Sequence, residues 1–385
     1  MHLPGTWLER FAADERHSTP RAGFDIGEAV AAYDRLLKAF QGRVRIQYAV
    51  KARPDHALLT ALVRRGSGLD VVAPQEIEQA LRAGCAPRHM SCSNAFADRQ
   101  ELTHARIRGV TTFTADSSDM IERIANVCPH SAVFIRIAQE NLTQAAIPIA
   151  GRFGCQEDEA PELALLAVRR GLKVAGLTWH VGSQQRDPTQ WEQALERAAR
   201  IVRRTDHHGV TVHHLNLGGG MPATYRASTP SVETYASVIL AAVDRHFPRH
   251  RQPRLIIEPG RALVADAGIT TASVKAVVGR PWGTYVILDV GMWNAGLLDN
   301  LCGIEYRITF PGHPSGCATQ PVTFCGPTCD PLDCLTATTP YRAPVALATG
   351  DRVVIWSTGA YCSTSALAGF NGYPPLPQHV HAPPP

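Results

Sequence analysis

Residues 43–54, Arg-Val-Arg-Ile-Gln-Tyr-Ala-Val-Lys-Ala-Arg-Pro, form a short run rich in β-branched and aromatic residues that ends at a lysine. Such a run, closed soon afterwards by a proline, is typical of a β-strand that stops in a turn. Lys51 is one of only four lysines among 38 basic residues. A lysine can lose its proton and attack a carbonyl group, which an arginine cannot do in a protein. A solvated charge at the end of a strand is the plainer interpretation, so the surroundings of Lys51 must decide.

Eight short apolar runs lie between residues 28 and 262, and longer amphipathic segments such as Pro74–Ala83 and Trp191–Arg204 separate them. This alternation is typical of βα units and a parallel sheet. Eight strands over about 235 residues is the size of a (β/α)8 (TIM) barrel, with a doubly wound open sheet as the main alternative. The runs are Arg45–Val50, Leu69–Ala73, Met90–Ser93, Thr112–Ala115, Ala132–Ile137, Leu177–Val181, His214–Leu217 and Arg254–Ile257.

Functional groups of such barrels gather at the carboxyl ends of the strands. In this chain a polar residue or a glycine falls at nearly every one of these ends, whereas the bodies of the runs stay apolar. This placement favours the barrel over the open sheet. The residues are Lys51, Asp70, Ser93-Asn94, Asp116, Arg136, His180–Ser183, Gly218–Gly220 and Glu258–Arg261.

The sequence pattern changes after about residue 265. Alternating strand-like runs such as Thr284–Asp289, Val322–Phe324 and Arg352–Trp356 now stand among Gly, Pro and Cys, which predicts a second, mostly-β domain. We expect the barrel to span residues 27–265, and residues 1–26 to add a strand or a helix to a second domain completed by residues 266–385. The proline-rich tail Pro374–Pro385 is expected to be extended or disordered.

Composition describes an ordinary globular protein of 385 residues, 45% hydrophobic and 19% charged. The formal charge of +4 and the scattered basic pairs predict neither a nucleic-acid nor a membrane partner. No secretory leader and no apolar span of membrane length is recognised, so we expect a cytoplasmic protein. In that compartment a disulfide framework is not expected for the ten cysteines, and their spacings fit no common zinc site, so we expect no metal.

Three strand ends carry groups that suit a phosphorylated, planar cofactor. The N–H groups of Gly218–Gly220 can close around a phosphate, although a tight turn uses the same residues. His180 would most often be a satisfied core residue, but a flat imidazole can also stack on a planar ring. Glu258 follows a buried run, and should therefore have a cationic partner or a raised pKa.

Together with Lys51, these groups suit pyridoxal 5'-phosphate (PLP). Lys51 would hold the aldehyde, the glycines and Arg261 the phosphate, and His180 one face of the ring. Glu258 would keep the pyridine nitrogen protonated, which makes the ring an electron sink.

Six motifs are spread over residues 48–375, nearly the whole chain. They are Tyr48–Lys51, His180–Ser183, Gly218–Gly220, Glu258–Arg261, Gly326–Asp330, and Gly359–Tyr361 with Phe370–Pro375. In this order they resemble the motifs of the fold type III PLP-dependent decarboxylases of ornithine, lysine and diaminopimelate, whose barrel is of the alanine racemase type. The pair Cys329-Asp330 and the run Phe370–Gly372 are similar to the ornithine/lysine branch.

The resemblance implies a role for each matching residue. Lys51 would carry the Schiff base with Glu76 nearby, His180 would stack on the ring, and Glu258 would pair with the pyridinium. Cys329 would reprotonate the α-carbon. The other cofactor-binding residues would be Asp70, Arg136, Ser183, Gly218, Gly219, Gly220, Arg261 and Tyr361.

The resemblance also concerns the amino-acid substrate and the quaternary structure. Asp330 would meet the distal amine of the substrate, and Phe370 would lie at the substrate site. In this family the equivalents of Cys329 and Asp330 reach the active site from the partner subunit, which implies a homodimer with shared active sites.

Two positions depart from the family pattern. The residue that relatives use to bind the distal ammonium group falls on Cys302, with Asp299 three residues earlier as a substitute. Arg152 stands where ornithine enzymes often have lysine. The substrate could therefore be an ornithine- or lysine-type amino acid, or a modified, conjugated or carrier-bound one.

Two alternatives to an α-decarboxylase remain open at this point. An amino-acid racemase on the same barrel usually has arginine at the pyridine nitrogen, which argues against it because this chain has Glu258. A non-catalytic regulator related to ornithine decarboxylase would not need Lys51, Glu258 and Cys329 together.

Overall fold

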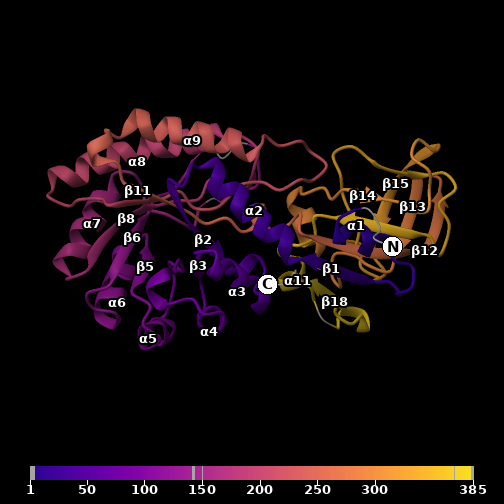
Figure 1. The fold of residues 1–385 in the computed structure, drawn as a ribbon, viewed down its shortest axis with the longest axis horizontal. Coiled ribbons are helices and arrows are strands. Elements are labelled where there is room, and N and C mark those ends of the chain that lie inside the picture. The colour runs from indigo at the N-terminus through magenta and orange to yellow at the C-terminus, as the bar shows by residue number, and fades with distance from the viewer. Residues whose placement is uncertain (1–4, 141–143, 150, 368, 383–385) are drawn as a thin grey trace. The chain divides into compact units, whose positions relative to one another are not determined.

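A computed structural model describes residues 5–140, 144–149, 151–367 and 369–382 (Figure 1). The chain forms two compact units. One consists of Ala31–Pro222 and Pro230–Gly260, and the other of Met1–Val30, Ala223–Thr229 and Arg261–Pro385.

The first unit is built on a closed barrel of parallel strands in the order β10-β11-β2-β3-β4-β5-β6-β8. The predicted barrel is therefore confirmed, and this unit does not have the doubly wound open sheet that was its main alternative. The strands are β2 (Val44–Ala49), β3 (Gly68–Val71), β4 (Met90–Cys92), β5 (Thr112–Ala115), β6 (Ala132–Arg136), β8 (Lys173–Thr178), β10 (His214–Asn216) and β11 (Arg254–Ile257).

Several strands end earlier than their apolar composition suggests. Strand β2 stops at Ala49, and Val50–Ala52 form the 3-10 helix η1, so Lys51 lies just beyond the strand rather than at its last position. Strand β8 ends at Thr178, so His180 also lies in the loop that follows. Apolar composition predicts burial, whereas the strand itself ends where its ladder of hydrogen bonds ends.

Helices surround the barrel strands (Figure 1). Both helices expected from the sequence are present: Pro74–Ala83 corresponds to α4 and Trp191–Arg204 lies inside α8. Helix α5 begins with a capping box, in which Asp98 and Glu101 each accept a backbone N–H of the other residue. The helices are α2 (Ile26–Ala39), α3 (His56–Arg64), α4 (Pro74–Arg82), α5 (Arg99–Ile107), α6 (Ser118–Val127), α7 (Glu159–Arg169), α8 (Thr189–His207) and α9 (Val232–His246).

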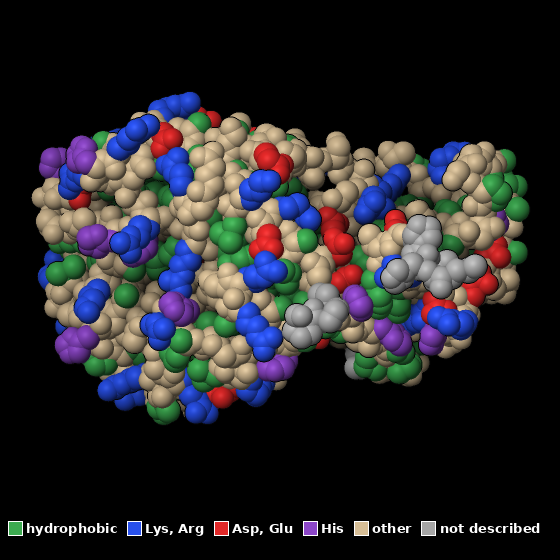
Figure 2. Space-filling view, viewed as in Figure 1, with side chains coloured by type: hydrophobic (Ala, Val, Ile, Leu, Met, Phe, Trp, Pro, Cys, Tyr) green, Lys and Arg blue, Asp and Glu red, His purple; other side chains and the backbone are tan. Residues whose placement is uncertain are grey.

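Short elements complete this unit. An antiparallel pair, β7 (Ala145–Ile147) and β9 (Ser183–Gln185), places Ser183 opposite Ile147. Two 3-10 turns, η2 (Pro87–His89) and η3 (Arg249–Arg251), precede β4 and β11. Lysine and arginine side chains are spread over the face drawn in Figure 2 and alternate with acidic ones, without gathering in one patch.

The second unit is built on an eight-stranded sheet with the order β14-β17-β12-β13-β15-β16, and β1 pairs with both β12 and β18. The mostly-β character expected after residue 265 is confirmed. The strands are β1 (Arg21–Asp25), β12 (Gly268–Arg280), β13 (Gly283–Leu288), β14 (Ile308–Thr309), β15 (Thr319–Cys325), β16 (Tyr341–Pro344), β17 (Arg352–Trp356) and β18 (Gln378–His381).

Helix α1 (Trp7–Ala13) packs on this sheet. It places Leu8, Phe11 and Ala12 in a buried cluster with Ile269 of β12 and Val354 of β17. Strand β1 pairs with β12 of the same sheet.

Part of the proline-rich tail is extended, which is one of the two conformations expected for it. Its residues Gln378–His381 form β18, which runs parallel to β1. His381 stacks on Trp7 with ring centroids 5.1 Å apart. Strand β18 lies between the prolines of the tail, so proline content alone did not exclude it.

Cys325 and Cys334 form a disulfide bond that the sequence analysis did not predict, since it expected no disulfide framework. The two residues also face each other in an isolated antiparallel bridge. A nine-residue separation along the chain gives no hint of this pairing, because the turn that brings the two residues together is a tertiary feature.

Among the described residues, no helix combines the length and the apolar character needed to cross a bilayer.

Candidate active site

Lys51 occupies the turn η1 directly after β2, and its side chain is exposed. Strand β2 pairs with β3 on one side and with β11 on the other. The N–H of Ala49 also donates to the carbonyl of Pro259, 3.3 Å away, just past β11. The two strand ends that flank Lys51 are therefore those that carry Asp70 and Glu258.

Two carboxyl groups beside Lys51 favour their protonated form. Asp70 is buried, and burial raises its pKa while the charge of Lys51 opposes the rise. Its Oδ1 has no hydrogen-bond partner in the described part of the chain. Burial also raises the pKa of Glu76 to about 7, although the N–H of Val72 donates to its Oε2 at 2.7 Å. The charge of Lys51 lowers the pKa of both carboxyl groups, so both lie near its side chain.

Glu258 is the third acid of this group. Burial, followed by the nearby Asp70, raises the pKa of Glu258 to about 8, whereas Asn216, Lys51 and Arg136 act in the opposite direction. The side-chain amide of Asn216 donates to Oε1 of Glu258 at 2.5 Å. The sequence suggested a cationic partner or a raised pKa, and the structure gives Glu258 a raised pKa. A carboxyl group in this state can hold or release a proton near neutral pH.

His180 is neutral at physiological pH. Burial lowers its pKa to about 3, and the charges of Lys51 and Arg136 lower it further. Its Nδ1 accepts the N–H of Gly182 at 3.0 Å, so the proton of the neutral ring lies on Nε2. An uncharged, fixed imidazole can lie flat against an aromatic ring without adding a charge to it.

Arg136 ends β6 and interacts electrostatically with Glu258, Asp116 and Asp70. Burial lowers the pKa of its guanidinium group, which these acids counteract. The guanidinium carbon lies 4.4 Å from the ring centroid of Phe153, and that of Arg152 lies 4.5 Å from the same ring. Two cations thus contact one aromatic ring at the edge of this group.

The loop that carries Arg152 and Phe153 is held in place by Gly154. Its N–H donates to Oδ2 of Asp116 at 2.9 Å, and its φ of +90° belongs to the left-handed region. A side chain at this position would collide with the backbone of Ile137 and Ala138. Only glycine allows this close approach to the end of β6.

The three glycines after β10 form a tight cradle. A Cβ atom added at Gly219 would lie 2.7 Å from the Glu258 carbonyl oxygen and 3.3 Å from Nε2 of His180. Cβ atoms at Gly218 and Gly220 would collide with the carbonyl oxygens of Trp179 and Gly182. Any larger residue would fill the space beside His180 and Glu258.

Arg261 belongs to the second unit and is already engaged there. Its Nη1 contacts Oδ2 of Asp299 at 2.6 Å and the hydroxyl of Tyr225 at 3.0 Å, and its guanidinium carbon lies 4.8 Å from the centroid of the Tyr361 ring. Its Nε is buried without a hydrogen-bond partner among the described residues. Asp299, the suggested substitute for binding the distal ammonium group, is therefore engaged in an ion pair with Arg261.

The predicted proton donor and substrate-binding residues also lie in the second unit, whereas Ser183 lies in β9 of the first unit. Cys329 is exposed, and its N–H donates to Oδ1 of Asn371 at 3.0 Å. Asp330 accepts the N–H of Leu332 at 2.8 Å, which leaves its other oxygen for a ligand. Cys302 is exposed at the end of the 3-10 helix η4 (Leu297–Cys302). Phe370, in η5 (Phe370–Gly372), packs against Trp293 at 5.4 Å between ring centroids.

The structure thus brings together one group of sequence-predicted residues: Lys51, Asp70, Glu76, Arg136, His180 and Glu258, with Gly219 beside them. Sequence reasoning assigned no role to Asn216 or Phe153. Asn216 stands next to the glycine run at a strand end, and this position was the only available signal for it.

Comparison with known proteins identifies the family of the chain. Residues 26–265 match the model of the pyridoxal binding domain of pyridoxal-dependent decarboxylases. The chain belongs to this family. It is therefore a PLP-dependent amino-acid decarboxylase, a lyase with a pyridoxal-binding barrel, and the racemase and regulator alternatives are not favoured.

Similar proteins cover most of the chain. The lysine/ornithine decarboxylase of Selenomonas ruminantium is 31% identical over 89% of this chain and 86% of its own length. The ornithine decarboxylase of Neurospora crassa is 30% identical over 91% of this chain and 78% of its own length. The crystal structure of the lysine decarboxylase of Selenomonas ruminantium superposes with a TM-score of 0.85 at 28% identity, and covers 99% of this chain and 96% of that one.

The residues around Lys51 fit the cofactor that the family uses. The glycine cradle beside His180 leaves room that any side chain would fill, and the buried Oδ1 of Asp70 lacks a partner among the described residues. Lys51 supplies the amine, and Glu258 supplies a carboxyl group able to share a proton with a ring nitrogen.

Proposed function

We propose that Lys51, Asp70, Arg136, His180, Gly218–Gly220 and Glu258 form the catalytic centre of this decarboxylase. The observation that carries the proposal is electrostatic: the charge of Lys51 acts on Asp70, Glu76, His180 and Glu258, which come from four different segments. Groups that shift one another's pKa at the carboxyl ends of barrel strands are typical of an active site.

PLP, when bound, supplies an aldehyde for an amine and a ring that accepts the electron pair released as carbon dioxide leaves. Lys51 would supply the amine that holds the cofactor. Glu258, with a pKa raised to about 8, keeps a proton at the ring nitrogen. Asn216 fixes the orientation of that carboxyl group.

His180 would cover one face of the ring without adding a charge, because burial and two nearby cations disfavour its charged form. Gly218–Gly220 and Ser183 offer donors for the phosphate. We also assign phosphate binding to Arg261 and Tyr361 on the strength of the motif match. The unpartnered Nε of Arg261 supports its assignment.

Cys329 is proposed to deliver the proton to the α-carbon after decarboxylation, from the partner subunit of a homodimer. Its exposure within one chain suits a residue that acts on a neighbouring subunit. Cys329→Ala is expected to retain the cofactor absorbance and to lower kcat by about 10²-fold, the usual contribution of a positioned acid. Cys317→Ala, a thiol of the same unit outside the proposed site, is the control and should retain activity.

A mixing experiment separates a shared site from a site within one chain. When inactive Lys51→Ala and Cys329→Ala chains are mixed and allowed to exchange, half of the dimers are hybrids, and each hybrid has one intact shared site. The mixture should recover about a quarter of the wild-type activity. Activity that stays at the level of the separate variants would contradict the shared site.

The substrate is proposed to be an amino acid whose distal end carries a modification or a conjugate rather than a bare ammonium group. Asp299 is neutralised by Arg261, Cys302 offers an uncharged thiol, and Arg152 adds a positive charge beside Phe153. These features favour a neutral or anionic distal group over a cationic one. Asp330 remains as an acid that could bind the distal ammonium group of a free diamino acid.

Carbon dioxide release from a panel of amino acids tests the proposed substrate class. We expect kcat/KM to be at least about tenfold higher for Nω-acylated diamino acids than for ornithine, lysine, arginine or diaminopimelate, the difference that one mismatched charge makes. A free diamino acid as the best substrate would contradict this proposal and leave the decarboxylase assignment intact. Arg152→Gln should lower the ratio of kcat/KM for the acylated substrates to kcat/KM for the free diamino acids. Arg169→Gln, on the exposed end of α7, should leave this ratio unchanged.

A further inference from the structure

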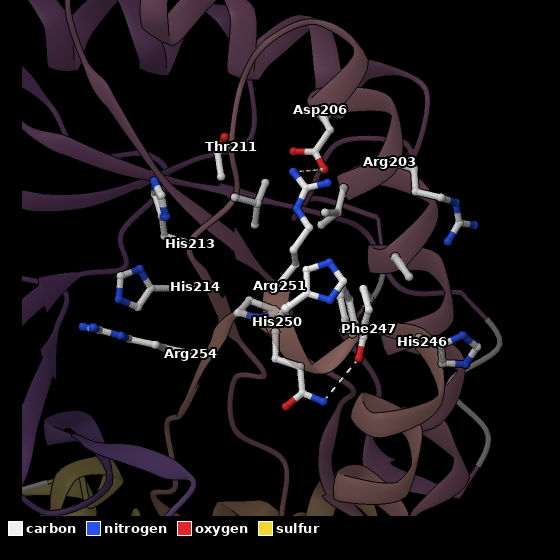
Figure 3. Close-up of a pocket in the computed structure, with 16 residues that line it drawn as sticks. Arg203, Asp206, Thr211, His213, His214, His246, Phe247, His250, Arg251 and Arg254 are labelled. Carbon is white, nitrogen blue, oxygen red and sulfur yellow. Dashed lines mark hydrogen bonds and ion pairs between the residues drawn. The ribbon is translucent and has the colours of Figure 1, made fainter.

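A cavity of about 680 Å³ opens at the amino-terminal ends of β10 and β11 (Figure 3). The last turns of α8 and α9, the segment before β10 and the 3-10 helix η3 form its wall. His214 and Arg254 are the first residues of β10 and β11 and are register partners. Glu258 lies four residues beyond Arg254, about 13 Å farther along the strand direction. The cavity is therefore separate from the candidate active site.

The wall of the cavity carries an excess of positive charge. The lining includes three arginines, Arg203, Arg251 and Arg254, and a single acid, Asp206. Nη2 of Arg251 lies 3.4 Å from Oδ2 of Asp206, as the dashed line in Figure 3 shows. Arg203 points away from Arg251 in this view. Arg254 has neither an ion pair nor a side-chain hydrogen bond within the described ranges of the chain, so its charge has no counter-ion in the wall.

Four histidines add to this charge when they are protonated: His213, His214, His246 and His250. His214 belongs to strand β10 itself, and its Nδ1 lies 3.2 Å from the carbonyl oxygen of Ala175. Burial lowers the pKa of His214, the hydrogen bond with the Ala175 carbonyl opposes this, and the charges of Arg254, His213 and Arg45 lower the pKa further. When its Nδ1–H donates to that carbonyl, Nε2 can take up a proton.

An anion in the cavity would relieve this repulsion. It would neutralise Arg254 and the part of the Arg251 charge that Asp206 does not neutralise. It would also favour protonation of His214. Planar guanidinium groups bind carboxylate and phosphate oxygens in pairs, which single-charged halide ions cannot exploit. The lining offers only one carboxylate, so a cation would find little to bind.

We propose that this cavity is a binding site for a small multivalent oxyanion, a phosphate compound or a polycarboxylate, held by Arg251, Arg254 and His214. The site lies at the opposite strand ends from the proposed catalytic centre and does not depend on the assignment of that centre. Binding at His214 takes up a proton, so affinity rises as the pH falls.

Calorimetric titration of the PLP-loaded protein with inorganic pyrophosphate and with citrate tests this site, at constant ionic strength and at pH 7.5 and 6.0. The loaded protein is used because the cofactor then fills the phosphate cradle of the active site. We expect saturable binding of at least one probe, an unchanged cofactor absorbance, and affinity that rises by up to about tenfold per pH unit for each proton taken up. Binding of pyrophosphate alone, citrate alone or both identifies the oxyanion class and supports the site.

Arg251→Gln/Arg254→Gln should weaken this binding by at least about tenfold, because it removes two charged donors. Arg249→Gln is the matched control: it removes the same charge from η3, and Arg249 does not line the cavity. Thermal unfolding of each variant reports its folding. No saturable binding of either probe, or an equal loss in Arg249→Gln and the double variant, would overturn the proposal.

Discussion

Lys51→Ala is expected to remove the visible absorbance of the cofactor and to lower kcat by at least about 10³-fold, as loss of a nucleophile does in other enzymes. The change removes the only amine in the group formed by Asp70, Glu76, His180 and Glu258. It also removes a charge that lowers the pKa of all three of these acids, so their pKa values should rise further.

Lys173→Ala is the matched control for this variant. Lys173 is exposed at the start of β8, at the other end of the barrel strands from the candidate active site. It should retain the absorbance band and full turnover. An unchanged band in Lys51→Ala, with turnover within a few-fold of wild type, would contradict the role of Lys51.

Glu258→Gln is expected to retain the cofactor and to lower kcat by about 10²-fold or more, the scale of a lost proton-transfer or proton-holding group. Glutamine has nearly the same volume, and its carbonyl can still accept the hydrogen bond from Asn216, so the local packing is preserved. Because Glu258, with a pKa raised to about 8, is itself largely uncharged at neutral pH, the neutral amide should not lower the thermal stability of the apoprotein.

Glu122→Gln is the corresponding control, because Glu122 forms a surface ion pair with Arg170 at 2.7 Å and lies on α6. Its turnover should match the wild type. Steady-state kinetics report the loss of turnover, and the absorbance spectrum shows whether the cofactor is still bound. Together they distinguish a defect in proton transfer from loss of the cofactor. Equal kcat values for Glu258→Gln and the wild type would exclude Glu258 as the group at the ring nitrogen.

The barrel could be predicted because its eight apolar runs recur with polar strand ends, a pattern that depends only on local sequence. Lys51 illustrates the limit of such reasoning. The apolar run continues past Ala49, so composition could not show that the ladder ends there and that Lys51 lies in a 3-10 turn.

Partners distant in sequence were the least predictable part of the candidate site. Asp299 forms its ion pair with Arg261, 38 residues earlier, and the fold of the second unit alone brings them together. Asn216 is one of only three residues in β10, too short a run for alternation to show which side its amide faces. The Cys325–Cys334 disulfide was also not predicted, because the turn that brings the two cysteines together is set by tertiary structure.

The most direct test of the whole account is borohydride reduction of the PLP-loaded protein, followed by proteolysis and mass mapping of the labelled peptide. The chain has only three other lysines, Lys38, Lys173 and Lys275, so the site of attachment is decided among four positions. The account predicts a single phosphopyridoxyl group on Lys51. A label on any of the other three lysines, or no label on a protein that is saturated with cofactor, would contradict it.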